Sequence, residues 1–238
     1  MRIWAIADLH LGFSTGKWMD RFGSHWEGHH LKVEANWKDR IAPQDLVLLP
    51  GDFSWAMKYE DARVDFSWLA TLPGRKVLVK GNHDYWWPKS VARMEELLPP
   101  GTYAMKRKAL MIDGVPLIGV RGADFVPPDS PDLPAAQAAL EREQKEFELS
   151  IAHLRTLGSG RCPPIALFHH PPFPPQSAES FFTRMIEESG ATICVYGHLH
   201  TPADWERTFQ GESKGVTYRL VACDYLNFVP LLVKELDP

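Results

Sequence analysis

Short runs rich in valine, isoleucine and leucine alternate with longer amphipathic stretches along most of this chain. Such alternation is typical of α/β proteins, in which helices cover sheets of mainly parallel strands. The apolar runs predict strands at residues 2–7, 45–49, 76–79, 109–112, 116–120, 165–168, 192–196, 203–208, 215–222 and 230–233. The amphipathic stretches predict helices at residues 26–40, 60–71, 89–98, 135–157 and 178–189.

The order of these elements predicts the sheets. The first part reads βαβαβα, which requires a largely parallel sheet with helices outside it, because parallel strands need crossover connections. The last three predicted strands follow one another without a helix, which favours an antiparallel arrangement. At 238 residues, one domain over 1–238 is the default expectation, and a chain of this size forms a core without disulfides.

Composition excludes several functions. No apolar stretch approaches the roughly 20 residues that span a bilayer. The first residues lack a signal-peptide pattern, because Asp8 and His10 interrupt the apolar run. Three cysteines at unrelated spacings fit a reducing compartment, and a net charge of −4 attracts neither nucleic acid nor an anionic membrane. We therefore expect a cytoplasmic protein with a small substrate, no membrane partner and no nucleic-acid partner.

Five polar clusters follow predicted strands. Ligands of α/β sheets bind beyond the carboxyl ends of the strands, so a single binding site would require polar residues directly after several strands. Each cluster alone has a plainer explanation, such as a Gly-Asp turn, but their conjunction predicts a metal site. In extended backbone, residues two apart point to the same side, so Asp8 should converge with His10, and His198 with His200. The clusters are Asp8-Leu9-His10, Gly51-Asp52, Gly81-Asn82-His83-Asp84, His169-His170-Pro171-Pro172 and Gly197-His198-Leu199-His200.

The side chains in these clusters indicate which metals could bind. A ligand set of two carboxylates, one amide oxygen and four imidazoles drawn from these clusters, without a thiolate, suits divalent manganese, iron, zinc, cobalt or nickel. Seven ligands are too many for one tetrahedral zinc, but they suit two ions that share a carboxylate. Two such ions, two aspartates and a bridging hydroxide leave a net charge of about +1, which attracts an anionic ester and supplies a nucleophile near neutral pH. This composition predicts phosphoryl chemistry.

In order and approximate spacing, the five clusters resemble the motifs of the calcineurin-like metallophosphoesterases, over positions 8 to 200. The resemblance implies an α/β fold of two facing mixed β-sheets flanked by helices, a four-layer α/β/β/α sandwich. It also implies a role for each matching residue. Asp8, His10 and His200 would hold one metal, Asn82, His169 and His198 the other, Asp52 would bridge them, and His83 would face the substrate and stabilise or protonate the leaving oxygen.

Two departures from the family narrow the substrate. Protein Ser/Thr phosphatases of this superfamily carry an arginine in the Gly-Asp motif and another directly before Gly-Asn-His-Glu. The matching segments here are Gly51-Asp52-Phe53-Ser54-Trp55-Ala56-Met57 and Lys80-Gly81-Asn82-His83-Asp84, which lack both arginines. We therefore expect a phosphodiester or nucleotide-like ester and not a phosphoprotein. The runs Ile-Trp-Ala-Ile-Ala-Asp-Leu-His-Leu and Asn-His-Asp-Tyr-Trp-Trp resemble a bacterial branch of predicted phosphohydrolases.

Several neighbours of the motifs have two interpretations. His170 is an alternative to His169 as ligand, and we prefer His169 because it is nearer the strand end. His170 is then a substrate contact, a partner of a metal ligand or a plain loop residue. Arg121 either contacts a substrate phosphate or forms an ion pair. Trp55 and Trp86, which follow metal motifs, either pack loops or form an aromatic wall for a nucleobase or aryl group. The histidines of residues 18–30 either begin a solvated helix or belong to a lid.

The principal hypothesis is a metallophosphoesterase with two divalent ions, manganese, iron, zinc or similar. A metal-bridging hydroxide would attack phosphorus in line while His83 assists the leaving group. A non-catalytic metal-binding scaffold of the same fold is an alternative, although this chain keeps every ligand position. A nuclease-type phosphodiesterase is another, which the acidic net charge and the lack of lysine and arginine clusters disfavour.

Overall fold

The computed structural model describes residues 1–236, and the chain divides into two compact units. Unit 1 comprises Met1–Ala104 and Val221–Pro238, and unit 2 comprises Met105–Leu220. The prediction of one domain over residues 1–238 stays a prediction, and its last two residues lie outside the described part. Each unit contains one mixed sheet with helices beside it, so the predicted α/β class is confirmed.

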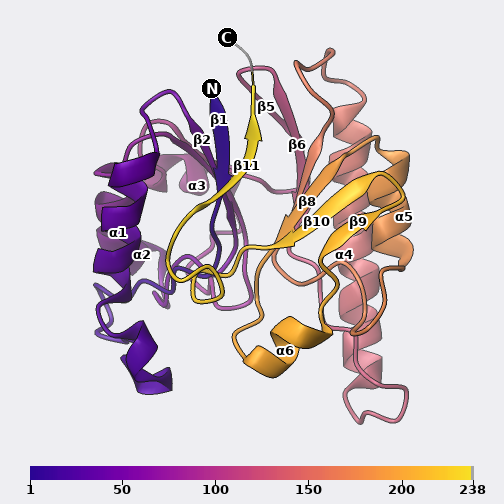
Figure 1. Ribbon diagram of the computed structural model, residues 1–238, viewed down its shortest axis with the longest axis horizontal. Helices are drawn as coiled ribbons and strands as arrows, with labels where there is room; N and C mark the ends of the chain where they lie inside the picture. The colour runs from indigo at the N-terminus through magenta and orange to yellow at the C-terminus, as the bar shows by residue number, and fades with distance from the viewer. Residues whose placement is uncertain (237–238) are drawn as a thin grey trace. The chain divides into compact units, whose positions relative to one another are not determined.

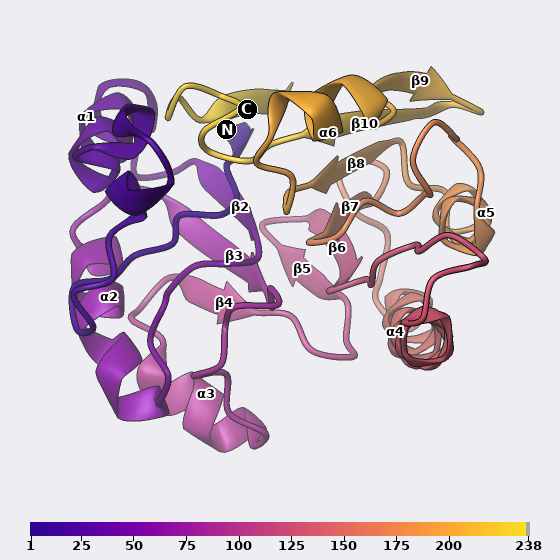
Figure 2. The same ribbon diagram turned by 90° about the horizontal axis from the view of Figure 1, so that it is seen from below.

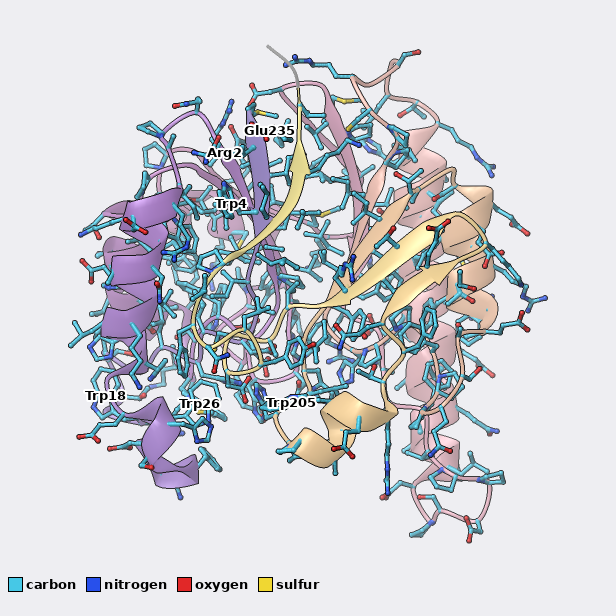
Figure 3. All side chains as sticks on the ribbon, in the orientation of Figure 1. Arg2, Trp4, Trp18, Trp26, Trp205 and Glu235 are labelled. Atoms are coloured by element: carbon cyan, nitrogen blue, oxygen red, sulfur yellow. The ribbon has the colours of Figure 1, made fainter. Side chains whose placement is uncertain are left out.

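The sheet of unit 1 has five strands in the order β11-β1-β2-β3-β4. Strands β1 to β4 pair in parallel, as the βαβαβα order predicts, and β11 pairs antiparallel with β1. Arg2 of β1 thereby lies opposite Glu235 of β11 (Figure 3). The strands are β1 (Arg2–Ala5), β2 (Leu46–Pro50), β3 (Arg75–Val79), β4 (Thr102–Ala104) and β11 (Leu231–Glu235).

Helices α1 (His29–Arg40), α2 (Tyr59–Ala70) and α3 (Val91–Leu97) lie along one side of this sheet (Figure 2). Their apolar faces and the sheet enclose a core that includes Trp37 of α1 and Phe66 of α2, both almost fully buried. All five residues of β2 are buried, which is typical of a central parallel strand. Two short 3-10 helices, Met19–Phe22 and Ser24–Trp26, precede α1.

The sheet of unit 2 has six strands in the order β5-β6-β7-β8-β10-β9. Strands β6, β7, β8 and β10 are parallel, and the edge strands β5 and β9 are antiparallel to their neighbours. The strands are β5 (Leu110–Ile112), β6 (Val115–Val120), β7 (Ile165–Phe168), β8 (Ile193–Tyr196), β9 (Gly211–Ser213) and β10 (Val216–Leu220).

Helices α4 (Leu133–Leu154) and α5 (Phe181–Glu188) flank this second sheet (Figure 1). An aromatic cluster joins the three elements: the ring centroid of Phe168 on β7 lies 4.9 Å from that of Phe147 on α4 and 5.3 Å from that of Phe182 on α5. Offset and edge-to-face ring pairs at such distances add to the stabilisation from buried area. No helix within residues 1–236 has the length and apolarity needed to span a membrane.

The structure corrects the predicted strand at residues 203–208, which is helix α6 (Pro202–Arg207). The local signal for a helix was present: the Thr201 side chain accepts a hydrogen bond from the Asp204 backbone, and Pro202 occupies the first turn. Both features favour a helix start. The prediction of an antiparallel end is also partly wrong, because β10 pairs in parallel with β8.

Candidate functional site

The first three polar clusters lie in unit 1, in the loops that follow the neighbouring strands β1, β2 and β3. Asp8, His10 and Asp52 are buried, whereas Asn82 and His83 are half-buried. Because the strands are parallel, their carboxyl ends meet at one edge of the sheet, as the sequence predicts. Ionisable side chains that are buried at a sheet edge need partners, since burial penalises an unpaired charge.

Backbone hydrogen bonds join the loops after β1 and β2. The Asp8 amide donates to the Gly51 carbonyl at 3.0 Å, and the His10 amide donates to the Asp52 carbonyl at 2.9 Å. The pairing continues from Leu11, whose amide donates to the Phe53 carbonyl at 3.0 Å. The loops that carry the predicted ligands are therefore continuous with the sheet, and their side chains are positioned by the strands.

The backbone at the predicted ligands is not extended. Asp8, His10 and Asp52 have φ angles of 60°, 44° and 50°, the left-handed region that residues with a Cβ rarely adopt. The extended geometry assumed for Asp8 and His10 is therefore wrong, although their convergence is confirmed. A ligand atom of Asp8 lies within 4.8 Å of one of His10, and the same holds for Asp8 and Asp52.

Asp84 is a residue of the third cluster whose part the sequence does not indicate. It is completely buried, and its carboxylate accepts five hydrogen bonds that tie the loop after β2 to the loop after β3. Burial, with the neighbouring Asp52 adding to it, raises the pKa of Asp84 to about 7, and the N–H donors oppose that shift. The donors are the amides of Asp52 (3.0 Å), Phe53 (3.0 Å), Ser54 (3.2 Å) and Gly81 (2.7 Å) and the indole of Trp86 (2.9 Å).

Gly81 allows the two loops to approach this closely. A Cβ added at this position would collide with the carboxylate and the backbone nitrogen of Asp52. Beside it, the His83 amide donates to Asp52 Oδ1 at 2.8 Å, and Asp52 Oδ2 lies 3.7 Å from His10 Nε2. The Asp52 carboxylate therefore lies between two imidazole-bearing loops, where the resemblance places a bridging ligand.

Two tryptophans near these loops differ in environment. The Trp55 ring stacks on His10 with centroids 4.8 Å apart and lies 4.5 Å from the His83 ring, so it restrains both imidazoles. Trp86 is 2% exposed and packs against Phe66 at 5.2 Å, so for Trp86 the structure shows the packing alternative. An aromatic wall that includes Trp86 would need this side chain to leave the core.

The segment before α1 supplies one buried histidine. His29 donates through Nε2 to the Leu9 carbonyl at 2.9 Å, and burial lowers its pKa, which keeps the ring neutral. Since Leu9 lies between Asp8 and His10, this bond supports the first ligand loop. His25 is exposed, and the half-buried His30 packs on Phe13 at 5.2 Å. The lid hypothesis for this segment stays a prediction.

In unit 2, the remaining clusters follow the neighbouring strands β7 and β8. The amides of His169 and His170 donate to the Arg121 carbonyl at 3.1 and 2.8 Å, and the Gly197 amide donates to the His169 carbonyl at 3.0 Å. His198 has a φ of 77°, which again is left-handed. Ligand atoms of His169, His170 and His198 all lie within 4.8 Å of one another, so His170 stays an alternative ligand.

Asp124 is a second residue whose part the sequence did not reveal. Its Oδ1 lies 3.0 Å from His170 Nδ1 and 3.2 Å from His198 Nε2. These two imidazole contacts hold the pKa of Asp124 well below its ordinary value, whereas burial lowers the pKa of His170 to about 4. A carboxylate behind an imidazole fixes the ring orientation of a metal ligand. Asp124 also follows a strand, β6, so the rule that found the other clusters applies to it.

The other predicted residues of unit 2 are placed as follows. The Arg121 guanidinium contacts the Glu143 carboxylate at 3.1 Å, so the ion-pair alternative is the one observed, and contact with a substrate phosphate stays a prediction. His200 is half-buried in the loop between β8 and α6. The indole of Trp205 on α6 donates to the Leu199 carbonyl at 2.9 Å and anchors the helix to this loop (Figure 3).

The donor chemistry fits divalent metal ions. The candidate ligands of unit 1 are carboxylates, an amide and imidazoles, and those of unit 2 are imidazoles with the Asp124 carboxylate beside them; these donors suit borderline divalent ions. Burial raises the pKa of the Cys194 and Cys223 thiols well above their ordinary value, which disfavours their thiolates as ligands. The buried His169 and His170 and the half-buried His198 form a compact imidazole group of the kind that holds a transition metal.

Comparison with known proteins gives a family match. The model of the calcineurin-like phosphoesterase family matches residues 1–202. Gene 66 protein of Mycobacterium phage D29 is 35% identical over 85 residues, which are 34% of this chain and 40% of that protein. Gene 66 protein of Mycobacterium phage L5 is 28% identical over 81 residues, 34% of this chain and 39% of that protein. The chain thus spans about two fifths of the length of these curated relatives.

Two solved structures share the fold. The protein of unknown function AQ665 from Aquifex aeolicus has a TM-score of 0.50 and 15% identity, covering 97% of this chain and 94% of that one. The phosphopantetheinyl hydrolase PptH from Mycobacterium tuberculosis has a TM-score of 0.51 and 18% identity, covering 93% of this chain and 89% of that one. At such identities the likeness concerns the fold.

Proposed function

Because the chain belongs to the calcineurin-like phosphoesterase family, we propose that it is a hydrolase of phosphate esters that uses two divalent metal ions. The proposed ligands are Asp8, His10, Asp52, Asn82, His169, His198 and His200. Manganese, iron and zinc all suit these donors. The proposed substrate is a small phosphodiester or nucleotide-like ester, because the arginines of the protein phosphatases are missing.

One observation carries this proposal: the full set of ligand types lies in loops that follow strands, and four of these residues have left-handed backbone. Residues with a Cβ avoid this conformation at a cost of about 1–3 kcal/mol, and such strain clusters at functional sites. Positive φ angles also occur at other residues with a Cβ, among them Arg107, Asp113 and Lys214, which belong to none of the five clusters. The four strained residues are Asp8, His10, Asp52 and His198.

Two divalent ions would supply a nucleophile at neutral pH and neutralise charge on the phosphoryl oxygens. The protein's own residues would orient the substrate and protonate the leaving oxygen. His83 is the proposed general acid for the leaving oxygen, because its backbone is fixed on Asp52 and its ring packs against Trp55 while remaining half-buried. Asp52 would hold the two ligand loops at a common carboxylate.

Metal analysis and a paired hydrolysis assay test the proposal. We expect close to two transition-metal ions per chain and hydrolysis of an aryl phosphodiester that stops with chelator and returns with manganese. The matching aryl phosphomonoester should be hydrolysed with lower kcat/KM, in agreement with a diester preference. One ion or none per chain would contradict the dinuclear centre, and a faster monoester would reverse the substrate assignment.

Two substitutions separate the roles within the site. Asp52→Asn should lower both the metal content and the activity, since a bridging carboxylate serves both ions. His83→Ala should lower kcat by about 10²–10⁴-fold while the metal content stays near that of the parent, because a general acid is not a ligand. Matched controls are Asp129→Asn, at an exposed position, and His153→Ala, on helix α4, which carries none of the polar clusters. Equal loss of metal and activity in His83→Ala would make His83 a ligand.

A further inference from the structure

Unit 2 contains a pocket of about 300 Å³ to which the proposed function assigns no role. Its walls are mainly apolar and include Phe125, Phe173, Pro171 and Leu199. His198, a proposed metal ligand, lies in the same lining. A phosphoester held at His198 would therefore have an apolar cavity beside it, of the size at which small-molecule sites begin.

The pocket is rigid on one side because Phe173 belongs to an aromatic cluster on the second sheet. Its ring lies 5.4 Å from that of Tyr196 on β8 and 5.6 Å from that of Tyr218 on β10. The Tyr196 hydroxyl donates to the Phe209 carbonyl at 2.6 Å, which fixes the chain on that side. A wall that is ordered before binding costs little entropy when a ligand enters.

Helix α6 and the proline-rich loop close the other side. The Gln176 amide donates to the Arg207 carbonyl at 2.9 Å, and Trp205 fastens α6 to the Leu199 carbonyl at 2.9 Å. Pro171 and the neighbouring prolines restrict their own backbone angles. These bonds link the loop after β7 to the loop after β8, so the pocket is held by both ligand-bearing segments of unit 2.

The charged side chains of the lining indicate what kind of group fits. Asp124 and Asp204 present carboxylates, which disfavour an anionic group in the cavity, and the exposed Arg207 lines the pocket as well. Two phenylalanine rings favour a flat π surface over a flexible alkyl chain. A guanidinium also contacts ring faces and ring heteroatoms favourably. The lining therefore suits an uncharged aromatic or heteroaromatic ring.

We propose that this pocket binds an aryl or heteroaryl group of the phosphoester substrate and selects such esters over alkyl esters. The inference rests on the proposed function, because it takes His198 as the side at which the phosphoryl group is held. Phe125, which is half-buried and lines the cavity, is then a specificity-determining residue. Its ring would lie against the substrate ring.

The test compares two phosphonates that the protein does not hydrolyse. With metal-loaded protein, calorimetry should show phenylphosphonate binding at least tenfold more tightly than methylphosphonate. Phe125→Ala should reduce this ratio below threefold. Phe125→Leu should give a ratio between that of the parent and that of Phe125→Ala. Phe22→Ala is the matched control, because Phe22 is exposed and outside the pocket lining, and it should keep the full ratio.

The outcomes separate the pocket from the proposed function. Equal binding of the two phosphonates, or a full ratio in Phe125→Ala, overturns the pocket assignment. If Phe125→Leu keeps the full ratio, the ring of Phe125 is not what selects the aryl group, and that claim is overturned. Unfolding midpoints near that of the parent show that the variants are folded. If phenylphosphonate is preferred but bis(p-nitrophenyl) phosphate is not hydrolysed, the proposed function fails and the pocket stands.

Discussion

The ligand loops of unit 1 and unit 2 are held in different ways. In unit 1, the completely buried Asp84 carboxylate accepts five N–H donors from the loops after β2 and β3. In unit 2, the loop after β7 donates from two amides to the Arg121 carbonyl and accepts from the Gly197 amide of the loop after β8. The Asp124 side chain, which is 62% exposed, contacts two imidazoles.

This difference separates two functions of an acidic residue. A buried carboxylate that satisfies backbone amides holds the chain itself, so its loss leaves several donors without partners. An exposed carboxylate behind an imidazole holds only the orientation of that ring. We therefore expect the loss of Asp84 in unit 1 to lower the free energy of unfolding and the loss of Asp124 in unit 2 to lower metal affinity.

The largest effect is expected for Asp84→Ala. The substitution leaves five N–H groups near the carboxylate position without their acceptor, so the free energy of unfolding of the metal-free protein should fall by about 3–5 kcal/mol. Urea denaturation followed by circular dichroism measures this change. Asp129→Ala, at an exposed loop position, should change stability by less than about 0.5 kcal/mol. A loss below about 1 kcal/mol in Asp84→Ala would refute the account of unit 1.

A smaller, pH-dependent effect is expected at Asp65 in unit 1. This buried carboxylate accepts hydrogen bonds from the Ser54 hydroxyl and from the Phe13 amide, and burial raises its pKa from 3.8 to about 6. Between these values the folded protein keeps a proton that the unfolded chain has lost. Raising the pH through this window therefore lowers the free energy of unfolding, by about 2–3 kcal/mol at most.

Asp65→Asn removes this titration while keeping the shape of the side chain. The variant should gain stability relative to the parent as the pH rises from 4 to 6.5, and unfolding curves at several pH values measure the difference. A parent-to-variant difference that does not change with pH would show that Asp65 has an ordinary pKa.

The smallest effect on stability is expected for Asp124→Asn, which replaces the partner of His170 and His198 in unit 2. The free energy of unfolding of the metal-free protein should change by less than about 0.5 kcal/mol. Metal affinity should fall by about 10–100-fold, as measured by competition with a fluorescent chelator. If Asp124→Asn loses stability and keeps its metal affinity, Asp124 holds the chain as Asp84 does, and the proposed difference between the two units is wrong.

The sequence predicts the strand ends and the polar residues after them well, because both signals are local. The roles of Asp84 and Asp124 could not be predicted from the sequence, because their partners come from other loops and no spacing in the chain encodes such contacts. Trp86 follows a motif, so only its burial shows that it packs in the core. For α6 the local signal for a helix lies in Thr201, which caps the first turn, and in Pro202.

The antiparallel pairing of β11 with β1 has a consequence for synthesis on the ribosome. Unit 2 is continuous in sequence and complete by residue 220. The sheet of unit 1 is completed only when the segment that contains β11 has been synthesised. Until that segment emerges, β1 is an open edge to which other chains can pair. We expect unit 2 to reach its folded form first. We also expect chains truncated at residue 220 to aggregate through the edge of β1 that β11 would otherwise cover.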